Sequence, residues 1–335
     1  MPAAYHAALD DPNAWVPYRY HPSNVAAITF VVAFGLTTLL HLFQLVRKKT
    51  WYFIPLVVGG TFESVGYGVR CVSHEDLWAL WAFLIQGILI LIAPAIFAAS
   101  IYIILGRIIL LVDGERYSMV RLKWLTKMFV AGDIFSFVLQ GAGGGIEAGG
   151  TLAALHTGEK LIVAGLFTQL FSFAFFVVVA ADFHHRLVHD RPVHKQLGHP
   201  RLAVPSSYYA GPATVPRTTL AELPWQRHLY NLYLTSGLIV IRNIFRVIEH
   251  IQGNAGYLLS REYYLYVFDA VLMLAIMLLF NWRHPSEITQ AYKRRTIRGD
   301  SAELQHLGDK DTGRETTGEK AAGTAHSACV QDAVV

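Results

Sequence analysis

The sequence predicts an all-α membrane protein, a bundle of seven transmembrane helices with its N-terminus outside and its C-terminus in the cytosol. Of the 335 residues, 53% are hydrophobic and only 16% are charged, which is unusual for a soluble chain of this length. Helices are required because lipid offers no partner to bare backbone groups, and each apolar run is near the roughly 20 residues that cross the hydrocarbon. The runs are residues 25–46, 52–70, 79–105, 124–142, 160–183, 228–249 and 262–282.

The basic residues between the runs orient the bundle. Clusters of arginine and lysine follow alternate runs, and the intervening segments are nearly free of them. Basic loops stay on the cytosolic side, so this alternation predicts an outside N-terminus. The formal net charge of +4 therefore needs no nucleic-acid partner, because the excess lies in the cytosolic segments. The clusters are Arg47, Lys48 and Lys49; Arg107, Arg116, Arg121 and Lys123; and Arg186, Arg191, Lys195, Arg201, Arg217 and Arg227.

Tryptophan supports the same spans. Its indole ring prefers the membrane–water interface, so tryptophans near the ends of helices form a belt. All seven fall near predicted ends: Trp15, Trp51, Trp78, Trp81, Trp124, Trp225 and Trp282.

The chain divides into one membrane domain and its flanks. We expect residues 1–23 to be an extracellular tail and residues 24–285 to form the membrane domain, including a cytosolic loop over 186–226. Residues 286–335 are polar, charged and rich in Gly, Ala and Thr, so we expect a disordered cytosolic tail.

Four of the runs carry pairs of charged or strongly polar residues spaced by seven. Seven residues are close to two helical turns, so each pair lies on one stripe of its helix. A charge that faces lipid costs at least a few kcal/mol, so we expect these stripes to face one another inside the bundle as a polar seam. The pairs are Glu63 with Arg70, Asp133 with Gln140, Arg242 with Glu249, and Glu262 with Asp269.

In the second run, Glu63, Tyr67 and Arg70 share one face. Two interpretations of Glu63 stay open: a contact for a cationic head group, or an ordinary salt bridge or hydrogen bond between helices. The third run contributes Gln86 and a mid-membrane Pro94, which frees a backbone carbonyl and bends the helix.

In the fourth run, an unpaired Asp133 would be costly, so we expect it to have a basic partner. Glycines 143–145 should end this helix; they lack the Gly-Lys-Ser/Thr ending of a phosphate loop.

The sixth run supplies the bases. Arg246 and Glu249 are spaced to pair locally, which leaves Arg242 for either Asp133 or Asp269.

The spans contain more acids than bases. The surplus favours a cationic amphiphile or proton-linked behaviour, although Glu262, at the end of a run, could simply reach water. The acids are Glu63, Asp133, Glu249, Glu262 and Asp269, against Arg70, Arg242 and Arg246.

Histidines crowd after the fifth run, with His185 and His189 one turn apart. Acidic or cysteine partners are missing, which favours a solvated basic loop over a metal site, so we expect no metal and no cofactor.

An ordered set of motifs spans residues 18–286. It comprises Tyr20-His21-Pro22-Ser23; His41; Glu63-x-x-Gly66-Tyr67-x-x-Arg70; Gln86; Ala93-Pro94; Asp133-x-x-Ser136-x-x-x-Gln140-x-x-Gly143-Gly144-Gly145; Gly165-x-x-x-Gln169; Arg242-x-x-Phe245-Arg246-x-x-Glu249; Glu262-x-x-x-Tyr266-x-Phe268-Asp269; and His284-Pro285. Together these motifs resemble the fungal RTA1-like family, also called the lipid-translocating exporter family.

The resemblance implies a seven-span protein of a fungal membrane, often the plasma membrane. Members are linked to resistance toward amphipathic toxicants, drugs and stress, and to release of sphingoid long-chain bases. The implied partners are membrane lipids and amphipathic small molecules. The residues we expect to contact substrate along the polar seam are Glu63, Tyr67, Arg70, Gln86, Asp133, Gln140, Gln169, Arg242, Arg246, Glu249, Glu262 and Asp269.

We expect a transporter rather than an enzyme, and two alternatives stay open. A seven-helix lipid sensor would share the topology, although the third run ends in Leu105-Gly106-Arg107 and lacks an Asp-Arg-Tyr-like inner end. An intramembrane zinc hydrolase would need several convergent histidines, and the spans offer essentially His41, with His250 and His284 at their ends.

Overall fold

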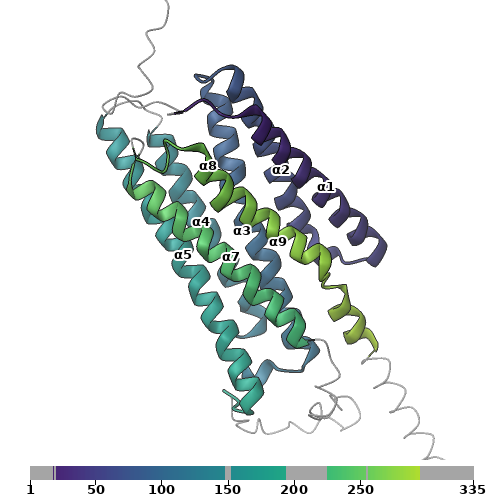
Figure 1. The fold of residues 1–335 in the computed structure, drawn as a ribbon. Coiled ribbons are helices and arrows are strands. Elements are labelled where there is room, and N and C mark those ends of the chain that lie inside the picture. The colour runs from purple at the N-terminus through teal and green to yellow at the C-terminus, as the bar shows by residue number, and fades with distance from the viewer. Residues whose placement is uncertain (1–17, 19, 148–151, 194–224, 254–255, 295–335) are drawn as a thin grey trace, which may run out of the picture.

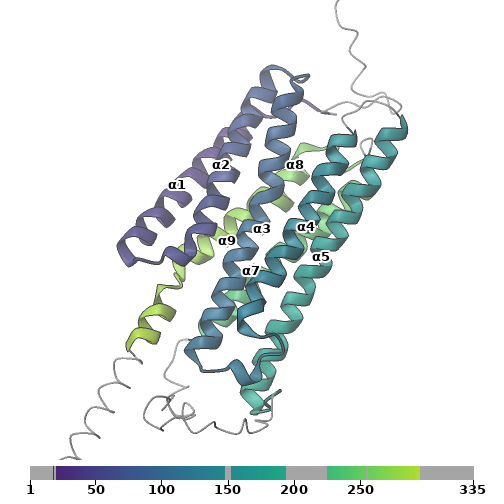
Figure 2. The ribbon, with the colours of Figure 1, turned by 180° about the vertical axis from the view of Figure 1, so that it is seen from behind.

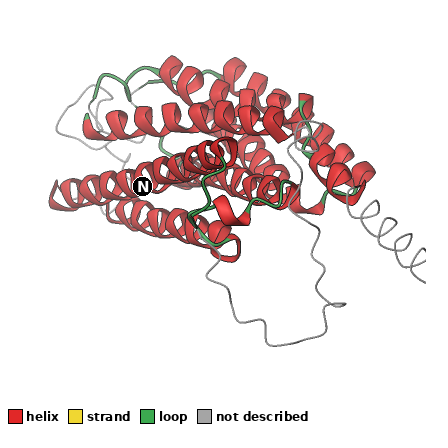
Figure 3. Cartoon of the chain, turned by 90° about the horizontal axis from the view of Figure 1, so that it is seen from below, coloured by secondary structure: helices red, strands yellow, loops and turns green. Residues whose placement is uncertain are grey.

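The computed structural model describes Tyr18 and residues 20–147, 152–193, 225–253 and 256–294. These residues form helices joined by loops, and Figure 3 shows no strand among them. The all-helical prediction is therefore confirmed for the described part of the chain.

Seven long helices run through the described residues when α8, η3 and α9 are counted as one column. Each coincides with one predicted run, and most extend beyond it. The longest, α5, has 38 residues, and at about 1.5 Å per residue it exceeds the ~30 Å of hydrocarbon. The elements are α1 Asn24–Lys48, η1 Trp51–Phe53, α2 Ile54–Glu75, α3 Leu80–Leu111, η2 Glu115–Tyr117, α4 Leu122–Glu147, α5 Leu152–His189, α7 Trp225–Ile251, α8 Glu262–Leu265, the π-helical η3 Tyr266–Ala270 and α9 Val271–Trp282.

Five of these helices are long and apolar enough to cross a membrane by length and composition: α1, α3, α4, α5 and the column Glu262–Arg294. The other two, α2 and α7, carry polar residues of the predicted seam, which lower their mean hydropathy. Both are packed among the apolar helices, so this is an integral multi-pass membrane protein.

The helices lie side by side in an elongated bundle. In Figure 1, α1 and α2 form one side, α4 and α5 form the other, and the column α8–α9 crosses between them next to α7. Helix α3 lies in the middle and contacts α2, α4 and α7. Its buried side chains run along most of its length, which explains why it is among the most apolar segments.

Aromatic rings fill the centre between α3, α4 and α5. Tyr102 packs on Phe176 with ring centroids 4.5 Å apart, and Phe129 meets Phe176 edge-on at 5.2 Å. Phe173 completes the cluster, and all four rings are buried. Aromatic packing of this kind helps to hold the three helices together.

Glycines 143–145 do not end α4, contrary to the prediction. The helix continues through them to Glu147. Gly143 lies against the backbone of α5, where an added Cβ would meet the carbonyl oxygen of Gly158 at 2.8 Å and the amide nitrogen of Ile162 at 2.8 Å. Close contact between the helices therefore accounts for a glycine here, as in other membrane interfaces built from small residues.

The first residues of the predicted C-terminal tail are ordered, contrary to expectation. Residues 286–294 form a helix, and Ile288 is buried in the main hydrophobic core. The Tyr52 hydroxyl donates to the carbonyl of Pro285 at 2.9 Å, and Arg107 lies over the Tyr52 ring at 3.4 Å. The remainder of the tail, and most of the loop predicted over 186–226, lie outside the described residues.

Of the six described tryptophans, four agree with the predicted belt, while Trp78 is half-buried and Trp225 is buried. Trp51, Trp81, Trp124 and Trp282 are exposed near helix ends, as an interfacial belt requires. Trp225 is buried, because its ring packs edge-on against His184 of α5. Trp15 lies outside the described residues.

Candidate functional site

An ion-paired group occupies the interior between α7 and η3. Asp269, in the π-helical turn, accepts from Nε of Arg242 at 2.6 Å and from Nη2 of Arg246. Arg246 also donates from Nη1 to Glu249 at 2.9 Å. The local Arg246–Glu249 pair matches the prediction, and Arg242 takes Asp269, one of its two predicted partners. Charge-assisted bonds of this kind are the strongest that buried side chains make.

Pro94 frees a backbone carbonyl that becomes a further hydrogen-bond partner of this ion-paired group. A proline has no N–H, so the carbonyl four residues earlier in α3, that of Ile90, loses its helical donor. Nη2 of Arg242 donates to that carbonyl at 3.0 Å. The carbonyl freed by the proline is therefore satisfied by the buried guanidinium, which links α3 to α7.

Asp133 has no basic partner among the described residues, and that prediction is wrong. Its Oδ2 accepts from the Tyr102 hydroxyl at 3.0 Å. The base expected for it, Arg242, is held by Asp269 instead. Two helical turns further along α4, Gln140 donates a hydrogen bond to Gln169 of α5 at 3.2 Å. These two predicted residues therefore do come together.

A second ionic group lies where α2 meets α8. Nη2 of Arg70 donates to Tyr20 at 2.6 Å and to Oε1 of Glu262 at 3.0 Å, and Nε donates to the Tyr266 hydroxyl at 3.2 Å. Tyr266 in turn donates to Glu262 at 3.0 Å. Glu262 is therefore an ion-pair partner rather than an acid that merely reaches water.

The chain before α1 is bound tightly to this group. We call Tyr18 and residues 20–23 the N-terminal strap. The amide of Ser23 donates to both oxygens of Glu262 at 2.9 Å, and Nδ1 of His74 lies 2.7 Å from the carbonyl of Pro22. The Tyr18 hydroxyl donates to Ser73 at 2.9 Å. Burial raises the pKa of Tyr18 and of Tyr20, so both side chains remain neutral hydrogen-bonding groups.

Glu63 differs from every other acid of the seam. It is completely buried, and neither carboxylate oxygen has a hydrogen-bond partner among the described residues. The hydroxyl of Tyr67, one turn away, is also without a partner. The interhelical bond considered for Glu63 is therefore not formed.

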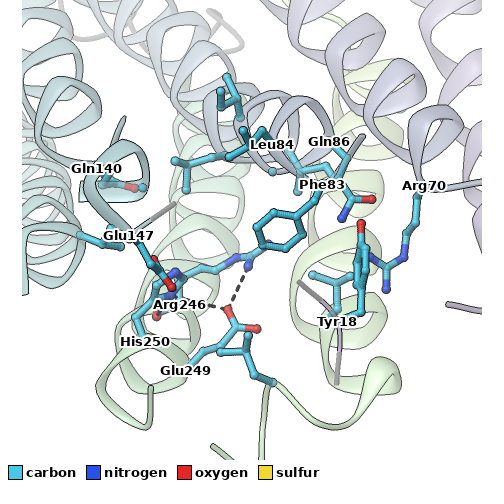
Figure 4. Close-up of a pocket in the computed structure, with 18 of the residues that line it drawn as sticks. Tyr18, Arg70, Phe83, Leu84, Gln86, Gln140, Glu147, Arg246, Glu249 and His250 are labelled. Carbon is cyan, nitrogen blue, oxygen red and sulfur yellow. Dashed lines mark hydrogen bonds and ion pairs between the residues drawn. The ribbon is translucent and has the colours of Figure 1, made fainter. Parts of the chain in front are cut away.

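A cavity of about 400 Å³ lies at the end of the bundle where α3 begins and α7 ends. Its polar wall combines Arg246 and Glu249 of α7 with Arg70, and with two amides, Gln86 and Gln140. Figure 4 shows Arg246 and Glu249 joined on one side and Tyr18 beside Arg70 on the other, with Phe83 between. The apolar wall is formed by Phe83, Leu84, Ile88, Ile90, Leu91, Ile162, Leu258, Leu259 and Leu265.

The structure sorts the predicted site residues into two groups. Five line the cavity: Arg70, Gln86, Gln140, Arg246 and Glu249. The others lie outside its lining: Glu63, Tyr67, Asp133, Gln169, Arg242, Glu262 and Asp269.

Several cavity residues were missed from the sequence. Tyr20 stood in a quoted motif, so its place in that motif was the available signal. Four others lie at or beyond the ends of the predicted spans: Tyr18, Glu147, His250 and Arg261. A charge or a phenol there does not face hydrocarbon, so no energetic cost marks it as functional.

The cavity has the chemistry of a small-molecule site. Such sites are mostly apolar, occupy about 300–1,000 Å³ and contain a few polar groups that orient the ligand. Here both signs of charge are present beside apolar walls, which suits an amphipathic molecule. No group of three or more His, Cys, Asp or Glu side chains is placed to share a metal ion in the described part of the chain.

Comparison with known proteins was made against families, curated proteins and solved structures. The model of the family described as RTA1 like protein matches residues 56–292. Protein RTM1 of Saccharomyces cerevisiae is 32% identical over 307 residues, which cover 80% of this chain and 91% of that protein. Protoporphyrin uptake protein 1 of Saccharomyces cerevisiae (strain ATCC 204508 / S288c) is 32% identical over 306 residues, covering 80% and 92%.

Sphingoid long-chain base transporter RSB1 of Saccharomyces cerevisiae (strain Lalvin EC1118 / Prise de mousse) is 29% identical over 273 residues. The match covers 77% of this chain and 70% of that protein. No solved structure matches this chain.

Proposed function

This chain belongs to the RTA1-like family, and we propose that it is a transporter that translocates or exports amphipathic lipids and lipid-like toxicants. Sphingoid long-chain bases and other single-chain or sterol-like amphiphiles are the substrate class. One relative is named a sphingoid long-chain base transporter and another a protoporphyrin uptake protein, and neither name is that of an enzyme. Removal of such compounds from the cell would confer resistance to them.

The cavity is the observation that carries this proposal. It places a mixed-charge wall beside an apolar wall at one end of a bundle of apolar helices. An amphiphile can put its head group against the polar wall and leave its tail among apolar side chains. A soluble substrate would leave the apolar wall unused.

The head-group contacts follow from which residues line the cavity. Glu249 provides a carboxylate for an ammonium, and Arg70 and Arg246 provide guanidinium groups for a phosphate or hydroxyl. Asp269 does not line the cavity. We therefore assign the ammonium contact to Glu249, in place of the Glu63 and Asp269 contacts that the sequence pattern suggested.

We further propose that the protein lies in the plasma membrane with the cavity end outside. The basic clusters Arg47–Lys49 and Arg107–Lys123 flank the opposite end of the bundle. By the positive-inside rule that end is cytosolic. Export would then end with the substrate in the cavity, next to the outer leaflet.

Flux of labelled sphinganine through proteoliposomes tests this function, with and without a pH gradient. We expect flux above that of empty liposomes, reduced at least five-fold by Glu249→Gln. A gradient that accelerates flux in the wild type but not in Glu63→Gln would assign proton linkage to Glu63. Identical flux with and without the protein would contradict the transporter function.

The lipid-sensor alternative has a distinct result in the same preparation. Saturable sphinganine binding, lost in Glu249→Gln, with no flux under any gradient would favour a sensor. The hydrolase alternative has no described cluster of metal-binding side chains in its favour.

A further inference from the structure

We propose, building on the transporter function above, that a single-chain amphiphile enters the cavity sideways from the membrane, through an opening between α3 and α4. Figure 2 shows these two helices close together where η2 joins them and separated toward the other end, with α8 visible between them. The cavity lies at this separated end.

The exposure of the lining residues shows on which side the cavity is open. Its deep wall is closed: Gln86 is 5% exposed and Gln140 is 2% exposed. Leu84 and Ile88 of α3 line the same cavity and are 37% and 49% exposed. These apolar side chains form the edge of an opening, and the exposed surface that continues from them along α3 includes Leu80, Trp81 and Ile85. In a membrane that surface contacts hydrocarbon.

On the opposite edge, α4 presents glycines. Gly141 and Gly145 are one helical turn apart, are exposed and line the cavity. A Cβ added at either would have no atom within 4 Å, and the same holds for Gly87 on the α3 side. The result is bare backbone along this part of α4, which leaves open space for a hydrocarbon chain beside it.

The opening is at a suitable depth for an amphiphile in a leaflet. Trp81 is 55% exposed at the start of α3, and tryptophans mark the membrane interface. Ile88 is seven residues further along, about 10 Å deeper at 1.5 Å per residue. The opening therefore spans the level at which an amphiphile holds its head group and first carbons.

The water side of the cavity is covered by the N-terminal strap. Tyr18 is buried, and its ring meets Phe83 edge-on at 5.4 Å. Tyr20 is tied to Arg70, and Leu258 and Leu259 add apolar cover from the segment before α8. Entry through the side thus avoids breaking the strap's hydrogen bonds.

Two buried acceptors inside the cavity are unused. The Oε1 atoms of Gln86 and Gln140 have no hydrogen-bond partner among the described residues. Buried polar atoms without partners are rare and unfavourable, so a ligand that donates hydrogen bonds here gains from both. Hydroxyl and ammonium groups are such donors, and both glutamines line the cavity that a head group would enter between α3 and α4.

Photo-crosslinking tests the route with the full-length protein in phosphatidylcholine liposomes. The probe is sphinganine with a diazirine in its chain, and adducts are mapped by mass spectrometry. We expect saturable adducts on residues 84–91 and 140–147, reduced at least ten-fold by the double substitution Gly141→Leu and Gly145→Leu. Gly87→Leu narrows the opening from the other edge and is expected to act in the same direction.

Gly237→Leu on α7 is the matched control. This glycine is also exposed with no atom within 4 Å of an added Cβ, and it does not line the cavity. It gains the same helix propensity per substitution, so unchanged labelling in this variant ties any loss to the opening itself. Adducts spread evenly over lipid-facing helices, or equal labelling in the opening and control variants, would overturn the lateral route.

Sphinganine flux measured in the same liposomes separates the two proposals. Wild-type flux in the double variant would overturn the lateral route and leave the transporter function standing. If the wild type is labelled at the expected residues, the double variant loses this labelling, and neither protein shows flux, the lateral site would be supported and transport contradicted.

Discussion

Asp269 and Glu63 are equally buried acids that differ in their hydrogen bonding. Asp269 accepts from two guanidinium groups, and Glu63 accepts from none among the described residues. Both were found by the same seven-residue spacing. The difference teaches that a polar stripe identifies which side chains face the interior. It does not identify which of them find hydrogen-bond or ion-pair partners there. Asp269 holds α7 to the last column, and Glu63 is free to serve another purpose.

Asp269→Asn should have the largest effect on stability. It removes the negative charge between Arg242 and Arg246, and breaking a buried ion pair from one side costs about 3–5 kcal/mol. Thermal unfolding in detergent measures this loss. Asp133→Asn is the matched control, because its only described side-chain partner is the Tyr102 hydroxyl and no positive charge is stranded. Equal losses in the two variants would contradict the assignment.

Glu262→Gln should have an intermediate effect that is confined to one end of the bundle. The charge-assisted bond to Arg70 weakens, as do the contacts with the amide of Ser23, at a cost of about 1–3 kcal/mol. Hydrogen–deuterium exchange of residues 20–26 should rise, while exchange in α3 and α5 stays unchanged. Glu75→Gln, at the exposed end of α2, is the control. Unchanged exchange in the strap would show that Glu262 does not hold it.

Glu63→Gln should have the smallest effect. The carboxylate makes no bond that the substitution could break, so we expect a change of less than about 1 kcal/mol in the free energy of unfolding. The same melting assay measures it beside Asp269→Asn. A loss as large as that of Asp269→Asn would show that Glu63 has a structural partner, and the contrast between the two acids would disappear.

The parts of the candidate site that could be predicted from spacing are those that depend on local geometry. Arg246 and Glu249 pair at a separation of three on α7, and Pro94 frees the Ile90 carbonyl within α3. Predictions that needed a partner on another helix were less secure. Arg242 had two candidate acids, and Asp133 was given a basic partner that it does not have. The glycines at 143–145 illustrate the same limit, since their meaning depends on the backbone of α5 beside Gly143 and on open space beside Gly145.

By itself, then, the sequence determined the class, the seven helices and the stripe on which each polar residue lies, because hydropathy and the 3.6-residue repeat act within one helix. Tertiary structure alone decided that Asp269 takes both arginines, that the strap covers one end, and that α3 and α4 separate beside a cavity. Those features depend on how far apart side chains of different helices lie once the bundle has packed, and no spacing along the chain encodes that distance.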